Sequence, residues 1–122
     1  MIVSHKELQV YKLAYRLAIE IYEITKSFPI EEKFSLTSQI RRSSRSVCGN
    51  LDEAFRKRRY EKAFVAKLSD SEGESAETQT WLDIAKDCGN INQEVCDKCN
   101  DQYDWIIGML VKMIKATEKW SF

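Results

Sequence analysis

Residues that interrupt helices are scarce in this chain of 122 residues, which contains one proline and four glycines. So few breakers predict long, uninterrupted helices. The longest purely apolar runs are only a few residues, which excludes the stretch of about 20 apolar residues that crosses a bilayer. The N-terminal sequence MIVSHKELQVYK lacks the apolar core and small-residue cleavage site of a secretory signal. We therefore expect a cytoplasmic protein with no membrane partner.

Side chains that carry chemistry are equally sparse. His5 is the only histidine, and no nucleophile or metal ligand accompanies it, so it gives no basis for a catalytic site. Cys96 and Cys99 have C-x-x-C spacing, but there is no second such pair, and a zinc site usually needs four close ligands. We favour buried free thiols over metal or redox chemistry for the four cysteines. The sequence predicts no enzyme, catalytic residue, metal, cofactor or small-molecule substrate.

Charge is present in ordinary amount but is unevenly distributed. Apolar residues make up 43% and charged residues 31% of the chain, as in a soluble globular domain, and the formal net charge is zero. Residues 41–62 hold eight basic and three acidic side chains, a net charge of +5, whereas residues 69–104 hold ten acids and two lysines, a net charge of −8. A neutral protein with such segregation can still present a basic face.

Apolar periodicity and end signals predict four helices in one domain spanning residues 1–122, at about 4–28, 31–57, 60–88 and 92–117. Ser4 and Glu7 form an S-x-x-E capping box, and Pro29 separates the first two helices. Gly89 supplies a left-handed helix stop, and Asn92 can cap the last helix. Because the connections are short, successive helices should be antiparallel neighbours. The expected fold is all-α, an up-down-up-down antiparallel four-helix bundle.

The first predicted helix has two apolar stripes, which is more than one core-facing side requires. The stripes are Val10, Ala14, Leu17, Ile21, Ile24 and Phe28, and beside them Leu8, Tyr11, Tyr15, Ala18 and Tyr22. One stripe can pack in the bundle and the other against a neighbouring subunit. A helix deeply seated within a monomer is the alternative.

Small polar residues occupy the middle of the apolar faces of the second and third predicted helices. They are Ser43, Ser44, Ser71, Ser75 and Thr78. Small side chains permit close approach of two helix backbones. Gly73 costs about 1 kcal/mol in a helix interior relative to alanine, so we expect a neighbour to pack tightly against it. Trp120 and Phe122 form an apolar tail that can fold back onto the bundle.

A basic stripe is the candidate working surface. Arg41, Arg45 and Arg56 lie nearly opposite the core stripe of the second helix, with Arg42 and Glu53 on an intermediate flank. The candidate nucleic-acid contacts are Arg41, Arg42, Arg45, Arg56, Lys57, Arg58, Arg59 and Lys62. The forked guanidinium group of arginine suits paired hydrogen bonds to phosphate, and Tyr60 could stack on a base. The alternative is that these cations pair with acids or contact another subunit.

A family resemblance rests on residues at set spacings. The sequence QIRR at 39–42 is followed by Ser46, Asn50, Glu53, Phe64, Leu68, Gly73, Glu77 and Leu82. This pattern resembles the bacterial four-helix-bundle family of 23S rRNA intervening-sequence proteins, also called S23 ribosomal proteins, with accessory proteins of diversity-generating retroelements as distant members. Ala54 and Glu74 stand where that family usually has glycine and serine.

The resemblance implies a homopentameric ring with RNA or a ribonucleoprotein as partner. It also marks Gln39, Asn50, Glu53, Gly73 and Glu77 as motif residues. These have a structural interpretation, in which Arg42, Glu53 and Glu77 form interhelix ion pairs and Asn50 satisfies backbone groups. We therefore hypothesise a non-enzymatic oligomeric bundle that binds structured RNA or another polyanion. The alternative is a scaffold that recruits a protein partner, with the basic face used for salt bridges or subunit contacts.

Overall fold

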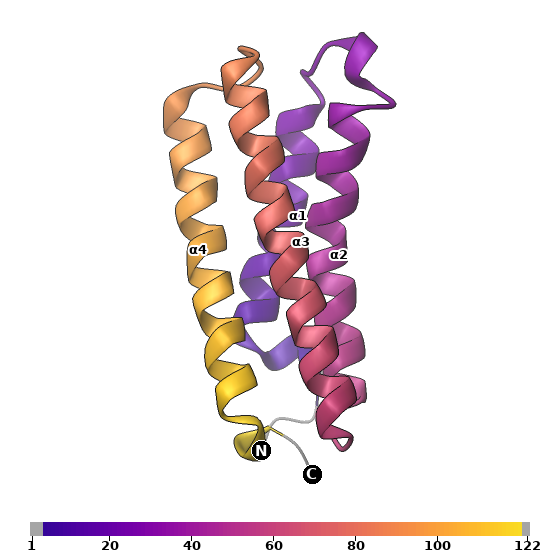
Figure 1. Ribbon diagram of the computed structural model, residues 1–122. Helices are drawn as coiled ribbons and strands as arrows, with labels where there is room; N and C mark the ends of the chain where they lie inside the picture. The colour runs from indigo at the N-terminus through magenta and orange to yellow at the C-terminus, as the bar shows by residue number, and fades with distance from the viewer. Residues whose placement is uncertain (1–3, 121–122) are drawn as a thin grey trace.

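The structure, a computed structural model, describes residues 4–120 and contains four α-helices that run alternately up and down (Figure 1). They are α1 (Gln9–Thr25), α2 (Leu36–Arg56), α3 (Glu61–Asp87) and α4 (Gln93–Lys115). Three single 3-10 turns accompany them, at His5–Glu7, Ile30–Glu32 and Thr117–Lys119. No strand occurs in residues 4–120. The predicted all-α antiparallel four-helix bundle is confirmed.

The first helix begins later and ends earlier than the expected 4–28. The capping box forms, since Ser4 Oγ accepts from Lys6 N at 3.2 Å and Glu7 Oε2 accepts from Ser4 N at 2.9 Å. It caps a 3-10 turn, however, because Leu8 adopts an extended conformation with φ −69° and ψ 130°. At the other end Thr25 Oγ1 donates to the carbonyl of Ile21 at 2.8 Å, and α1 ends there.

The second helix begins at Leu36 and not near residue 31. Pro29 opens the 3-10 turn instead. The Glu32 carboxylate then accepts from Leu36 N at 3.1 Å, which satisfies a donor in the first turn of α2. Glu32 thereby takes the place of a side-chain cap from Ser35. The predicted junction between the second and third helices lies where expected, between Arg56 and Glu61.

The stop signal between the last two helices is confirmed. Gly89 has φ +81°, Asn90 N donates to the carbonyl of Ala85 at 2.8 Å and Gly89 N donates to that of Lys86 at 2.9 Å. These two bonds form the Schellman arrangement that closes α3. Asn92 Oδ1 accepts from Val95 N at 2.8 Å and caps α4, as predicted.

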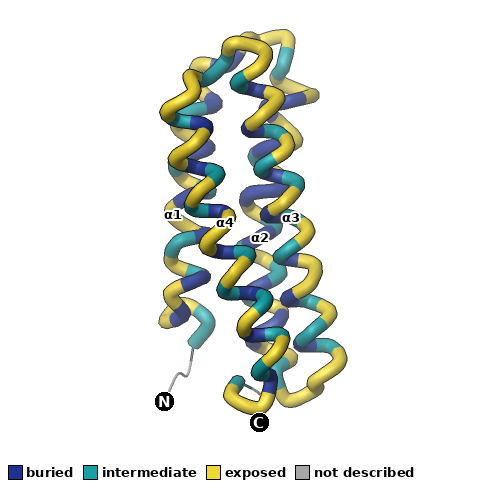
Figure 2. The backbone as a smooth tube through the Cα atoms, turned by 60° about the vertical axis from the view of Figure 1, so that its left-hand side comes forward, coloured by how far each residue is buried: buried dark blue, intermediate teal, exposed yellow. Residues whose placement is uncertain are grey.

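Buried residues of all four helices face the inside of the bundle (Figure 2). They form a main core cluster and a smaller cluster of Phe28, Leu36 and Ala85. Cys96 and Cys99 are buried and Cys48 is half-buried, but Cys88 is exposed, so the expectation of buried thiols is wrong for Cys88. Burial raises the pKa of the Cys48 and Cys99 thiols to about 11. Both are therefore protonated, unreactive thiols at neutral pH.

The helices α2 and α3 pack most extensively against each other, along a line of buried hydroxyl groups that we call the α2–α3 seam. Ser71 Oγ donates to the carbonyl of Val47 at 2.8 Å, and Thr78 Oγ1 donates to Ser43 Oγ at 2.7 Å. Small side chains thus permit the close approach that the sequence predicts. The expectation for Gly73 is wrong, because no described atom outside its own helix backbone lies within 4 Å of a Cβ added there.

The C-terminal tail returns to the bundle, where Trp120 packs against the core; Phe122 lies outside the described residues. Among residues 4–120, no helix has the length and apolar character needed to cross a membrane.

Candidate nucleic-acid interface

The eight predicted contact residues fall into two groups on α2 and the α2–α3 turn. Arg41, Arg42 and Arg45 lie in the first half of α2, whereas the other five follow from Arg56 onward. Arg45 and Arg56 are eleven residues apart, a rise of about 16 Å along the helix. Between them Asp52 Oδ1 pairs with His5 Nδ1 at 3.2 Å. The predicted basic residues therefore form two patches along α2 and the α2–α3 turn.

Arg42 is turned toward α3 and bound by its carboxylates. Its Nη1 lies 2.9 Å from Glu74 Oε2, and its Nη2 donates to Glu77 Oε2. Gln39 Oε1 accepts from Arg42 Nε at 3.3 Å, and Trp81 Nε1 donates to Glu77 at 3.3 Å. Arg42 is therefore a structural residue of the α2–α3 seam. The ion-pair interpretation of Arg42 and Glu77 is confirmed, and carboxylates of α3 already balance the charge that Arg42 was predicted to offer to RNA.

Glu53 and Asn50 take roles that differ in detail from those expected. Glu53 pairs with Lys67 of α3, with Nζ 2.6 Å from Oε2, and not with Arg42. The hydrogen bond from Lys67 holds the pKa of the Glu53 carboxyl below its usual value. Asn50 Nδ2 donates to the carbonyl of Ser46 at 2.9 Å, which satisfies a backbone group of its own helix.

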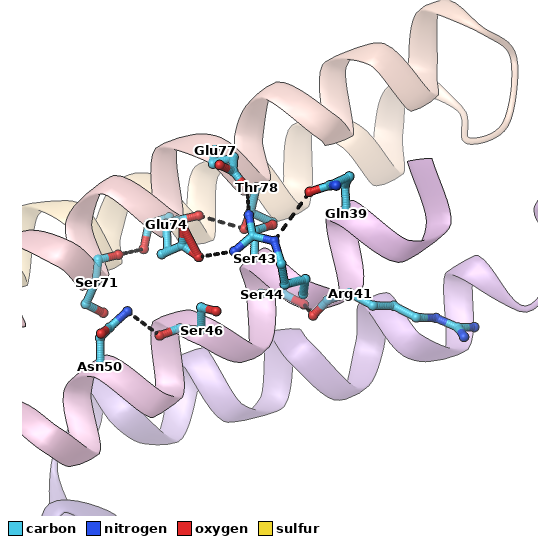
Figure 3. A network of polar contacts seen from close by, with 12 residues as sticks. Gln39, Arg41, Ser43, Ser44, Ser46, Asn50, Ser71, Glu74, Glu77 and Thr78 are labelled. Carbon is cyan, nitrogen blue, oxygen red and sulfur yellow. Dashed lines mark hydrogen bonds and ion pairs between the residues drawn. The ribbon is translucent and has the colours of Figure 1, made fainter. Parts of the chain in front are cut away.

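Arg41 points away from the seam and toward α1 (Figure 3). Its Nε donates to Thr25 Oγ1 at 2.7 Å, and its guanidinium lies 4.7 Å from the centroid of the Tyr22 ring. The Arg45 guanidinium lies 6.0 Å from the same ring. Within residues 4–120, neither arginine forms an ion pair with a carboxylate. Neutral partners fix Arg41 in place and leave its charge uncompensated.

Both arginines line an open groove of about 680 Å³ on the outer side of α2, which we call the α2 groove. The groove is lined by Lys33, Phe34, Thr37, Ser38, Arg41, Arg42, Arg45, Ser46 and Gly49. None of these described residues is acidic, and Arg42 is already neutralised by α3. The α2 groove therefore carries the uncompensated charge of Lys33, Arg41 and Arg45 in a setting that favours an anion.

The second basic patch surrounds the turn between α2 and α3. Arg58 Nη1 donates to the carbonyl of Phe55 at 2.8 Å, and its guanidinium lies 3.7 Å from the Phe55 ring. Burial and the neighbouring Arg56 and Arg59 lower the pKa of Arg58. The exposed residues of the patch are Arg56, Lys57, Arg59, Tyr60 and Lys62. Several cations held this closely repel one another, and a polyanion would relieve that repulsion.

An apolar groove of about 360 Å³ runs beside the α2 groove on α1. It is lined by Tyr11, Tyr15, Ala18, Ile19, Tyr22, Arg45 and Cys48. The second stripe predicted on the first helix therefore faces outward, apart from Leu8, which is buried in the core, and Tyr11, which packs against it. Ile19 lies with the outward-facing residues and is 50% exposed. Tyr15 is 55% exposed, so this side of α1 is not covered by the rest of the monomer.

Lys33 and Phe34 were missed as site residues by the sequence analysis. They lie between the 3-10 turn and α2, and no helical stripe includes them. The sequence does contain one signal for Phe34. It is a large apolar residue that follows the proline turn, and no predicted helical stripe offers it a packing partner.

Known proteins similar to this chain agree with this architecture. The family model described as 23S rRNA-intervening sequence protein matches residues 6–112. A crystal structure of a protein of unknown function from the S23 ribosomal protein family of Bacteroides thetaiotaomicron superposes with a TM-score of 0.79. The two sequences are 28% identical, and the alignment covers 88% of this chain and 96% of that one. No curated protein matches the chain.

Proposed function

This chain belongs to the 23S rRNA-intervening sequence protein family, and we propose that it is a non-enzymatic oligomeric bundle that binds structured RNA or another polyanion. The contacts are Arg41 and Arg45 in the α2 groove and the basic residues of the α2–α3 turn. The proposal places the protein in the cytoplasm, where RNA is accessible to it.

One observation carries the proposal: the α2 groove holds three cations that no carboxylate within residues 4–120 neutralises. Exposed arginine is normally paired or solvated at little energetic gain. Here Arg41 is instead held rigidly by Thr25 and Tyr22, so less side-chain entropy is lost when a phosphate binds. Each phosphate neutralised releases counterions, which gives RNA binding its driving force and its dependence on salt.

Oligomerisation is part of the proposal and is supported by the outward aromatic side of α1. Tyr15, Ile19 and Tyr22 are exposed around the apolar groove. The resemblance of the motif residues to the family implies a ring of five subunits. A neighbouring copy that covered this side of α1 would bury the exposed aromatic surface and bring the basic patches of several subunits together.

Charge reversal in the α2 groove tests the proposal directly. The variant Arg41→Glu with Arg45→Glu should abolish retention of RNA on a filter at low salt while leaving helicity unchanged. The matched control is Lys12→Glu with Arg16→Glu, which makes the same change in net charge at the same helical spacing on exposed residues of α1. The control should keep retention. Absence of retention by the wild type, or equal loss in both variants, would contradict the proposal.

A second candidate function is a scaffold that recruits a protein partner, which the apolar groove on α1 favours. The net acidic segment from Asp70 to Asp104 offers a further surface for a basic partner. Affinity purification with and without nuclease separates the two functions. Partners that disappear after nuclease treatment support RNA binding, and partners that persist support the scaffold.

A further inference from the structure

We propose that the α2 groove holds an unpaired nucleotide of RNA, with its base stacked on Phe34 and its flanking phosphates bound by Arg41 and Arg45. This inference rests on the proposed RNA-binding function and narrows it. It predicts that the protein selects loops, bulges or ends over continuous duplex.

The exposure of Phe34 is the first observation behind the inference. The residue is 87% exposed, although it lies only two residues before the start of α2. Burial of a phenylalanine normally stabilises a fold, and Phe34 makes no such contribution to the core. Lys33 Nζ lies 5.4 Å from the centroid of its ring. An aromatic face beside a cation suits a nucleobase, which has both a π-face and a nearby phosphate.

The arrangement of the groove along α2 is the second observation. Thr37, Arg41 and Arg45 follow one another at intervals of four residues, so they form one row along the helix. Arg41 and Arg45 are then about 6 Å apart along the axis. Phe34 stands at the start of this row. Gly49 ends it without a side chain that would block the path of a strand. A short extended strand can thus contact the aromatic ring first and the arginines after it.

The two features together favour unpaired RNA over duplex. Bases in a duplex are stacked on each other, and A-form RNA displays mostly phosphates and 2′-hydroxyl groups. Phe34 would find no free base to stack on in a duplex and would add little to binding, whereas an unpaired base can stack on its ring. Hydroxyl groups of Thr37, Ser38 and Ser46 also line the groove. They can hydrogen-bond the sugar or base of a strand that lies in it.

Binding of matched RNAs to Phe34 variants tests the inference. The probes are a labelled oligouridylate, which remains single-stranded, and a blunt-ended RNA duplex of two complementary strands with the same number of phosphates, compared by fluorescence anisotropy at one fixed salt concentration. Phe34→Ala should weaken binding of the oligouridylate about tenfold and leave the duplex unchanged, since one stacked base contributes about 1–3 kcal/mol. Phe34→Tyr keeps the ring and should bind as the wild type does.

Ile30→Ala is the matched control, because Ile30 is 85% exposed on the same connection but does not line the α2 groove. It should bind both probes normally. Equal affinity of Phe34→Ala and wild type for oligouridylate, or equal loss on both probes, would overturn the inference. So would a change in assembly mass without a change in RNA affinity, which would make Phe34 a subunit contact. If the wild type binds the duplex and Phe34→Ala changes neither affinity, only this inference is overturned. If the wild type binds neither probe, the proposed function is overturned as well.

Discussion

Arg41 and Arg42 are adjacent in the sequence, yet they lie on two sides of α2 with different physical properties. Arg42 faces α3, where Glu74 and Glu77 bind its guanidinium. Arg41 faces α1, where its partners are the Thr25 hydroxyl and the Tyr22 ring. On the α3 side the charge of Arg42 is paired with carboxylates, and on the α1 side the charges of Arg41 and Arg45 have no carboxylate partner among residues 4–120. The difference shows that the neighbouring helix, and not the arginine itself, decides whether a charge is available to a ligand.

Serines on α2 show the same contrast. Ser43 is fully buried in the α2–α3 seam, where it accepts from Thr78 Oγ1 at 2.7 Å. Ser38, earlier on the same helix, is exposed and lines the α2 groove. A small polar residue permits close packing in one case and lies exposed in an open groove in the other.

Enlarging the buried serine should give the largest change in stability. Ser43→Leu forces extra volume between two close helices and removes the hydroxyl that Thr78 contacts, so we expect a loss of about 3 kcal/mol in the free energy of unfolding. The matched variant Ser38→Leu should change it by no more than about 0.5 kcal/mol. Urea denaturation followed by circular dichroism measures both. Similar values for the two variants would show that the seam is not close-packed.

Removing the seam arginine should have a smaller effect. Arg42→Gln leaves the partly buried carboxylates of Glu74 and Glu77 close together without a cation, and we expect a loss of about 1 kcal/mol in unfolding free energy. Combining it with Glu74→Gln and Glu77→Gln should recover most of that loss, because no unpaired charge remains. Arg41→Gln leaves no carboxylate without a cation, so it should lower the free energy of unfolding by less than Arg42→Gln in the same denaturation experiment. The reverse order would contradict the assignment of the two sides.

The helical architecture was largely predictable from sequence because it depends on local signals. Apolar periodicity, Gly89 and Asn92 each specify a conformation through neighbouring residues alone. The helix ends near Leu8 and Leu36 were not predictable, because a 3-10 turn and the Glu32 carboxylate satisfy the backbone there. Such choices depend on how the connection meets the bundle.

The candidate site was predictable only in outline. The periodicity of α2 separated Arg42 from the stripe of Arg41 and Arg45, but it could not show that Glu74 lies within 2.9 Å of Arg42. That contact depends on the rotation of α3 against α2. Phe34 belongs to no helical stripe, and the sequence could not show that it stays exposed beside the cations of the α2 groove.

The salt dependence of RNA binding tests the contrast between the two sides of α2 most directly. The slope of log K against log salt concentration should fall in magnitude by about 1.4 in Arg41→Gln with Arg45→Gln, because each phosphate of single-stranded RNA that the protein neutralises adds about 0.7 to the slope. In Arg42→Gln, at a temperature where it is fully folded, the slope should equal that of the wild type. An equal fall in both variants, or a slope in the double variant that matches the wild type, would contradict the assignment of Arg41 and Arg45 as the available cations.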